Sequence, residues 1–240
     1  MYAIGDIHGR LDLFRALADA IEQNDKDRGQ AETQIIVLGD LIDRGPDSAG
    51  VLEAVRSWQA QRTVHVLAGN HEEMFLQSID DIETFRHFLR FGGDETVLSY
   101  PVDKLAFEQA DLEEAHEMMR TAIPEADVEF IRGFEHYREI GDYLFVHAGI
   151  RPGEPVMEQR IEDLHWIRGP FLEHLDDFGH IVVHGHSIRE KPEIRRNRIG
   201  IDTGAFMSGR LTALGLEGTE RWLIETEQRE GEISVSVTPA

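Results

Sequence analysis

Several short segments of this sequence place aspartate, histidine or asparagine next to glycine, directly after an apolar run. They are Gly5-Asp6-Ile7-His8-Gly9, the GDLIDRG stretch from Gly39 to Gly45, Gly69-Asn70-His71-Glu72, Val146-His147 and His184-Gly185-His186. Ligands of open α/β sheets bind just beyond the carboxyl ends of the strands, and glycine permits tight turns and close backbone approach. We therefore expect these side chains to gather in one crevice, although they lie far apart in sequence.

Each of these signals has a plain structural explanation when it is taken alone. A strand-end aspartate usually caps a helix or forms a turn, and a lone histidine is more often a polar residue in packing than a ligand. The repetition of oxygen and imidazole donors at five strand ends is what favours a shared site.

The elements that must position these residues alternate between strand and helix in the first part of the chain. The pattern predicts an α/β core with parallel strands, built as one domain over residues 1–240. Residues from about 72 to 133 lack strand patterning and are expected to form a helical cap inserted in that domain. The expected strands are Tyr2–Asp6, Thr33–Asp40, Arg62–Gly69, a hairpin over His136–Ala148, His180–Gly185, and a strand-rich tail over Arg198–Val237; the expected helices are Arg10–Glu22, Asp47–Gln59 and stretches near 158–176, with a charged loop over Asn24–Glu32.

Composition excludes several classes of function. The chain has 240 residues, no cysteine and a net charge of −22, so neither a disulfide framework nor a thiolate nucleophile is available. Such an acidic chain is a poor nucleic-acid binder. We expect no membrane partner, because no run of eighteen apolar residues occurs. The first residues carry no signal-peptide pattern, and the expected location is the cytoplasm.

The motifs together resemble a known superfamily. GDIHG, GDLIDRG and GNHE, followed by FVHAGI and VVHGHS, are similar to the signature of the metallophosphoesterases, and more narrowly of the phosphoprotein phosphatase family. The FGGDET stretch from Phe91 to Thr96 and Ile201-Asp202-Thr203-Gly204 resemble its bacterial serine/threonine phosphatases. The resemblance implies a calcineurin-like fold, in which two mixed β-sheets form a sandwich flanked by helices.

The resemblance also implies a binuclear metal centre. Asp6 and His8 would bind a first metal ion, Asp40 would bridge both ions, and the second would be completed by Asn70, His147 and His186. A donor set of oxygen and imidazole without thiolate suits Mn²⁺, the expected ion, with Fe or Zn²⁺ as alternatives.

Catalytic and phosphate-binding residues are implied in the same way. His71 is the expected general acid, and Asp43 would orient it; a plain turn residue is the alternative for Asp43. Arg44 and Arg168 are the expected phosphate clamps, with a surface arginine as the alternative for Arg168. His184, which precedes the ligand His186, is expected to support the metal ligands from behind or to be structural. Surface or packing roles are expected for the remaining histidines, which are His65, His87, His116, His136, His165, His174 and His180.

The implied activity is metal-dependent hydrolysis of phosphomonoesters, with a phosphoserine or phosphothreonine protein or peptide as substrate and a metal-bridging hydroxide as nucleophile. The main alternative is a symmetrical diadenosine tetraphosphate hydrolase, although those enzymes typically carry aspartate where this chain has Glu72. A non-catalytic phosphatase-fold binding protein and a phosphodiesterase are remoter alternatives. Ile188 weakens the latter, because it stands where phosphodiesterases carry a second histidine.

Overall fold

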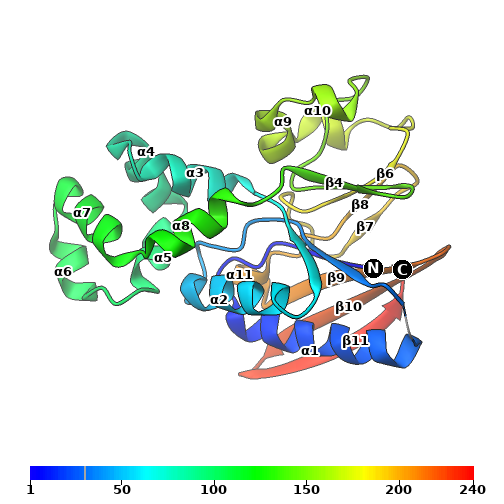
Figure 1. Ribbon diagram of the computed structural model, residues 1–240, viewed down its shortest axis with the longest axis horizontal. Coiled ribbons are helices and arrows are strands. Elements are labelled where there is room, and N and C mark those ends of the chain that lie inside the picture. The colour runs from blue at the N-terminus through cyan, green and yellow to red at the C-terminus, as the bar shows by residue number, and fades with distance from the viewer. Residues whose placement is uncertain (30) are drawn as a thin grey trace.

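Two β-sheets packed face to face form the centre of the molecule (Figure 1). The structure, a computed structural model, describes residues 1–29 and 31–240. One sheet has six strands in the order β11-β10-β9-β1-β2-β3 and the other has five in the order β4-β5-β6-β8-β7. The strands of the first sheet are β1 (Tyr2–Ile4), β2 (Gln34–Val37), β3 (Thr63–Val66), β9 (Arg210–Glu217), β10 (Glu220–Arg229) and β11 (Glu232–Pro239).

Both sheets mix parallel and antiparallel pairs, as the family resemblance implied. In the first sheet β1, β2 and β3 are parallel, whereas β9 runs antiparallel to β1, so that Ala3 lies between Ile36 and Leu214. In the second sheet β5, β6 and β8 are parallel, with antiparallel edges. Its strands are β4 (Tyr137–Ile140), β5 (Tyr143–Val146), β6 (Ile181–His184), β7 (Glu193–Ile194) and β8 (Arg198–Gly200).

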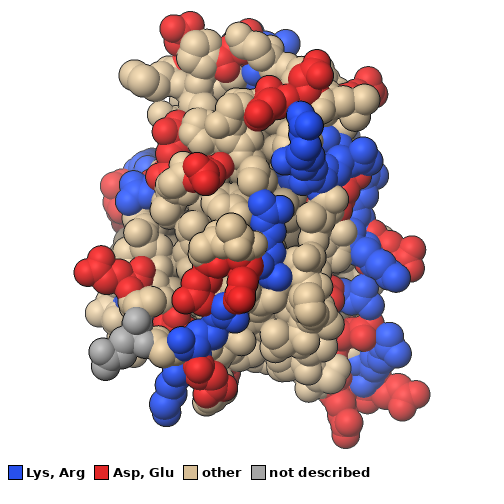
Figure 2. All heavy atoms as spheres, turned by 90° about the vertical axis from the view of Figure 1, so that its right-hand side faces the viewer, with Lys and Arg blue, Asp and Glu red and all other residues tan. Residues whose placement is uncertain are grey.

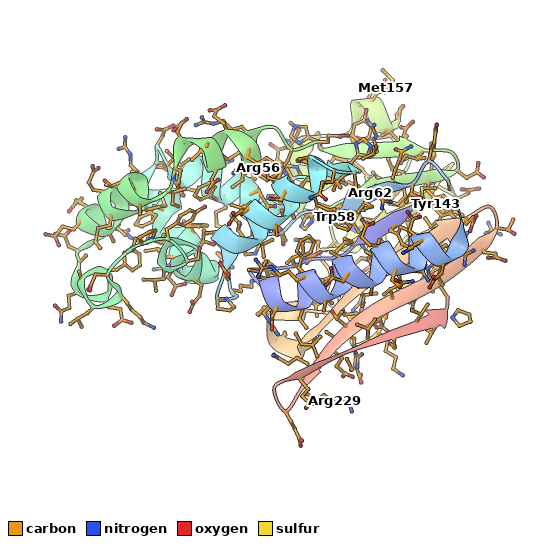
Figure 3. The ribbon with its side chains drawn as sticks, turned by 60° about the horizontal axis from the view of Figure 1, so that its bottom comes forward. Arg56, Trp58, Arg62, Tyr143, Met157 and Arg229 are labelled. Carbon is orange, nitrogen blue, oxygen red and sulfur yellow. The ribbon has the colours of Figure 1, made fainter. Side chains whose placement is uncertain are left out.

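Helices cover the outer faces of the sandwich. Between the sheets lies an apolar layer that includes Ile36, Phe145 and Leu214. The outer face of the six-stranded sheet packs against α1 (Leu11–Arg28) and α2 (Ser48–Gln59), and that of the five-stranded sheet packs against α9 (Ile161–Trp166) and α10 (Gly169–Leu172). Figure 3 shows Trp58 at the end of α2 facing α1, where its Nε1 donates to Glu22.

The charged loop predicted over Asn24–Glu32 is wrong in its first half, because α1 continues to Arg28. Tertiary contacts stabilise these polar turns of the helix. Asn24 accepts hydrogen bonds from Tyr2 and Trp222, and Asp25 pairs with Arg62. The helix ends before Gly29, whose φ of 102° favours glycine. Gln30, also within the predicted loop, lies outside the described residues.

Other boundaries follow the predictions more closely. The hairpin over His136–Ala148 turns at Gly141, where φ is 59°. Asp47 caps α2 by accepting from the backbone N–H of Gly50 at 2.8 Å. The helices near 158–176 are shorter than predicted. The sequence pattern did not reveal β7, the short helix η2 (Val156–Glu158) or α11 (Ala205–Ser208), each of which has four residues or fewer.

The segment predicted as a helical cap is helical and projects from one side of the sandwich (Figure 1). Arg56 of α2 pairs with Asp127 at 2.5 Å and lies over the ring of Phe130, which ties the segment to the body of the fold. That the segment controls access to the site stays a prediction. Its helices are α3 (Asn70–Ser78), α4 (Ile82–Phe88), η1 (Leu89–Gly93), α5 (Asp94–Leu98), α6 (Lys104–Gln109), α7 (Leu112–Ala122) and α8 (Glu125–Arg132).

Charges of both signs share the surface. The face seen in Figure 2 carries groups of Lys and Arg side chains with Asp and Glu side chains beside them. The chain has a net charge of −22, yet this face also presents positive charge. Among the described residues, no helix has the length and apolarity needed to cross a membrane.

The helical segment should depend on its own apolar centre. Phe85 is fully buried there, whereas Phe91 is 51% exposed. We expect Phe85→Ala to lower the free energy of unfolding by about 3–5 kcal/mol, because it leaves a cavity. Phe91→Ala is the matched control, with an expected change within about 0.5 kcal/mol. Urea denaturation measures both. Equal losses would show that Phe85 does not anchor the segment.

Candidate metal centre

Strand ends bring the predicted metal ligands together. Asp6 and His8 follow β1, Asp40 follows β2, and Asn70 begins α3 just after β3. In the second sheet, His147 follows β5 and His186 follows β6. All of these side chains are buried, with at most 6% of each exposed. Parallel strands of both sheets therefore deliver polar side chains to one edge of the sandwich.

The backbone is strained where these side chains leave the strands. Six non-glycine residues of the described chain have positive φ, and five of them are predicted site residues. Such a conformation costs about 1–2 kcal/mol per residue, and it persists only where the surrounding structure enforces it. The five are His8 (46°), Asp40 (50°), Asp43 (73°), Arg44 (69°) and His186 (60°).

Two glycines allow carboxylates to lie directly against the backbone. A Cβ atom at Gly69 would fall 2.1 Å from Oδ1 of Asp40, and one at Gly185 would fall 2.0 Å from Oδ1 of Asp6. No side chain fits at either position without moving the carboxylate. These glycines of the GNHE and HGH motifs thus serve the geometry of the site.

Carbonyl oxygens set the tautomers of two histidines. His8 Nδ1 lies 2.8 Å from the carbonyl oxygen of Ile42, and His147 Nδ1 lies 2.8 Å from that of Leu38. A carbonyl only accepts, so each Nδ1 carries the proton. Burial lowers the pKa of both rings, to about 3 for His8. In these neutral rings the lone pair is therefore on Nε2, which is the arrangement found in histidines that bind metals.

The lone pair of His147 faces other acceptors. His147 Nε2 lies 3.1 Å from Oδ1 of Asn70 and 3.4 Å from Oδ1 of Asp40. Three acceptor atoms this close repel one another unless a cation lies between them. The donor set of carboxylate, amide oxygen and imidazole fits Mn²⁺, Fe or Zn²⁺.

Asp40 belongs to two potential metal clusters. Ligand atoms of His8, Asp40 and His71 lie within 4.8 Å of one another, and so do those of Asp40, His147 and His186. Burial by itself would raise the pKa of the Asp40 carboxyl, whereas positive charge at the positions of His147, His71 and His8 lowers that pKa. Because the rings of His8 and His147 are neutral, bound cations would have to supply this charge. A shared, ionised carboxylate is what the predicted bridging role of Asp40 requires.

Asp6 lies at the edge of this arrangement, outside both clusters. Its carboxylate accepts from the backbone N–H of His186 at 3.0 Å and lines the same cavity as Asp40. Burial, together with the nearby charges of Asp202 and Asp40, raises the pKa of Asp6 well above its ordinary value. A cation beside it would relieve that repulsion.

The predicted general acid and its partner form a buried pair. His71 Nδ1 lies 2.6 Å from Oδ2 of Asp43, and Thr96 donates to Oδ1 of Asp43 at 2.5 Å. Burial raises the pKa of Asp43 despite these two contacts. Burial opposes protonation of His71, but Asp40 and Asp43 outweigh it and raise its pKa. The Asp43 side chain therefore contacts His71 and Thr96, rather than only completing a turn.

Both predicted phosphate clamps reach the centre. Arg44 lies 2.8 Å from His71 Nε2 and 3.1 Å from His8 Nε2, and its guanidinium lies over the ring of Phe206. Arg168 donates from Nε to Nε2 of His186 at 3.0 Å. Arg168 is exposed, yet its guanidinium points at the centre, in contrast to the surface alternative.

The structure also adds residues to which the sequence motifs assigned no role. Glu72 is buried, and its carboxylate accepts from the backbone N–H groups of Asp40, Leu41 and Gly69. Burial and the charge of Asp40 raise the pKa of Glu72 to about 7. Asp202 and Thr96 lie in the IDTG and FGGDET stretches, whose family resemblance was the only indication in the sequence that these residues belong to the site. His184 is buried outside both clusters, and its Nδ1 lies 3.0 Å from the carbonyl oxygen of Gly185.

Comparison with known proteins agrees with this geometry. The calcineurin-like phosphoesterase family matches residues 1–190. This chain belongs to that family. It is 26% identical over 235 residues to the asymmetrical bis(5'-nucleosyl)-tetraphosphatase PrpE of Anoxybacillus flavithermus, with 88% of each chain covered. It is 29% identical over 218 residues to serine/threonine-protein phosphatase 1 of Salmonella typhimurium, with 88% of this chain and 89% of that one covered.

Solved structures bear out the fold. A protein provisionally named a diadenosine tetraphosphatase superposes with a TM-score of 0.64 at 18% identity, covering 99% of this chain and 92% of that one. The calcineurin-like phosphoesterase fold predicted from the motifs is thereby confirmed, and the chain is a metal-dependent phosphoesterase.

Metal analysis can test the assignment of ligands. We expect the purified protein to hold two equivalents of divalent metal, Asp6→Asn to lower the affinity for one, and Asp40→Asn to lower the affinity for both, because Asp40 belongs to both clusters. Equilibrium dialysis followed by elemental analysis measures the stoichiometry. Retention of two tightly bound equivalents by Asp40→Asn would show that Asp40 is not the bridge.

Proposed function

We propose that this chain hydrolyses phosphomonoesters, with phosphoserine and phosphothreonine proteins or peptides as its substrates. The observation that carries the proposal is the cluster of buried carboxylate and imidazole groups around Asp40, which lies beside two arginines and a buried histidine–aspartate pair. The proposed ligands of the two cations are Asp6, His8, Asp40, Asn70, His147 and His186, and Mn²⁺ is the first ion to test, before Fe and Zn²⁺.

The protein's own residues would handle the phosphate and the proton. Two divalent cations bound here would supply Lewis acidity and a nucleophile at neutral pH. Arg44 and Arg168 present guanidinium forks that match the oxygens of a phosphoryl group. Once a bound phosphate draws Arg44 away from His71 Nε2, that nitrogen could carry a proton and give it to the leaving oxygen. Asp43, itself held by Thr96, would keep the opposite side of the ring in place.

The need for a proton donor supports an ester substrate. Serine and threonine leave as alkoxides, which are strongly basic and must be protonated as the P–O bond breaks. A buried carboxylate that orients His71 is suited to that step. The name of the Salmonella relative, serine/threonine-protein phosphatase 1, supports the same substrate.

A dinucleoside tetraphosphate is the second candidate substrate. The name of the Anoxybacillus relative supports it over 88% of the chain. Glu72 no longer counts against it, because this side chain caps three backbone N–H groups and is not among the residues that line the cavity in the described chain. Whether this residue is glutamate or aspartate therefore affects how the loops are held, and not which groups contact the substrate.

A substrate panel distinguishes these activities. The protein, stripped of metal and then supplied with Mn²⁺, is assayed on a phosphoserine peptide, an aryl phosphate, an aryl phosphodiester and diadenosine tetraphosphate. We expect hydrolysis of the peptide and the aryl phosphate only when metal is present. Full activity of the stripped protein would contradict the metal-centred reaction, and activity on diadenosine tetraphosphate alone would replace the proposed substrate with the second candidate. Chromatography of the nucleotides would show whether cleavage is symmetrical.

The role of His71 can be tested with leaving groups. We expect His71→Asn to slow turnover of the phosphoserine peptide by about 10²–10⁴-fold, the range for loss of a general acid. The loss should be smaller for an aryl phosphate, whose leaving group needs less protonation. Metal content serves as the control for the integrity of the site. Equal losses on both substrates would contradict the acid role.

A further inference from the structure

A third arginine borders the cavity that holds the metal centre. The cavity has a volume of about 460 Å³ and is lined by Asp6, Asp40, Arg44 and Arg168. The residues that follow His186, from Ser187 to Arg189, line it as well. Arg189 is exposed, so its guanidinium is accessible from solvent.

Arg189 forms no ion pair and no side-chain hydrogen bond with any of the described residues, unlike the arginines near it. Arg195 and Arg198 both pair with Glu193, at 2.8 and 3.0 Å. Glu193 is therefore engaged by other cations. An unpaired guanidinium at the mouth of a cavity in a chain of net charge −22 is available for an anion.

The backbone fixes where Arg189 begins. Its N–H donates to the carbonyl oxygen of Asp202 at 3.0 Å, and Asp202 lies beside Asp6, the proposed ligand. The positive φ of His186 turns the chain just before this segment. Arg189 is thus held at the rim of the cavity by the same elements that hold the centre.

Other groups of this rim suit a larger ligand. The hydroxyl of Ser187 is buried and has no hydrogen-bond partner among the described residues. Ile188 is 40% exposed, and Leu172 and Phe206 line the cavity with it. Within the part of the chain that the structure describes, the rim therefore combines an unpaired guanidinium, an unpaired hydroxyl and apolar surface.

We propose that Arg189 is the centre of a second phosphate subsite, which binds the phosphate next to the one under attack and so admits nucleoside polyphosphates. The inference rests on the metal-centred reaction proposed above. Arg44 and Arg168 are assigned to the transferred phosphoryl group, and a polyphosphate carries further negative charge that this acidic protein would otherwise repel. A guanidinium matches a phosphate in a bidentate way, while the apolar rim would contact the nucleoside. A phosphomonoester does not need this subsite.

Selectivity is the quantity that tests the subsite. We expect Arg189→Ala to lower the ratio of kcat/KM for diadenosine tetraphosphate to kcat/KM for an aryl phosphate by about 10- to 100-fold, the size of losing one hydrogen bond to a charged group. Arg189→Lys should restore part of the ratio, since it keeps the charge without the fork. Arg196→Ala is the matched control, because Arg196 is exposed in the same segment and does not line the cavity; it should leave the ratio unchanged.

Binding of products gives a second readout that does not need turnover of a polyphosphate. ADP and AMP differ by one phosphate, so calorimetry at fixed free Mn²⁺ isolates the subsite. We expect the preference for ADP over AMP to fall in Arg189→Ala and to persist in Arg196→Ala. An unchanged preference and an unchanged ratio would overturn the proposal. So would a loss confined to phosphopeptides with acidic neighbours, which would assign Arg189 to peptide recognition. Failure of the proposed reaction is distinguishable, because the wild type would then be inactive on the aryl phosphate while ADP binding still reports on Arg189.

Discussion

The structure depends on the crowding of buried acceptor atoms around Asp40. His147, Asn70 and Asp40 direct lone pairs at one another across 3.1–3.4 Å, and Asp6 adds a second buried carboxyl nearby. Buried acceptor atoms held this close repel one another, and their backbone donors do not remove that repulsion. The fold therefore carries a free-energy penalty that bound cations would offset. The same crowding explains why the loops carry strained residues and why glycine is needed at positions 69 and 185, where a Cβ atom would meet a carboxylate.

The sandwich makes that crowding possible. Each sheet contributes parallel strands whose carboxyl ends lie at the same edge, so residues as distant as Asp6 and His186 meet. Around them, Glu72 accepts from three backbone N–H groups and ties the loop after β2 to the start of α3. Thr96 comes from the helical segment and bonds to Asp43, while Gly92 of the same segment accepts from the backbone N–H of Arg44. Thr96 and Gly92 therefore support Asp43 and Arg44 from the helical segment. Among the described residues from 72 to 132, no residue lines the cavity itself.

The proposed second phosphate subsite would place substrate selection at the rim of the cavity. Arg44 and Arg168 already contact the proposed ligands, which suits them to a phosphate held at the metals. The stretch from Ser187 to Arg189 differs, because its polar side chains have no partner among the described residues and its apolar side chain is exposed. A relative named as a tetraphosphatase and another named as a protein phosphatase match nearly the same length of this chain. Substitution of a few rim residues around an unchanged metal centre would let one fold act on either phosphoproteins or dinucleoside tetraphosphates.

The sequence by itself determined the family, the fold class and the strand-end placement of Asp6, His8, Asp40, Asn70, His147 and His186, because these depend on local patterns of apolar residues and glycine. It could not determine where α1 ends, since Asn24 and Asp25 remain helical through contacts with Trp222 and Arg62, far away in the chain. Nor could it assign Glu72, Thr96 or Asp202, whose partners lie on other elements. Tertiary structure alone decided that Arg168 turns toward His186, that Arg189 has no partner beside the cavity among the described residues, and which lone pairs face one another. Those properties depend on distances between segments, and no spacing along the chain encodes them.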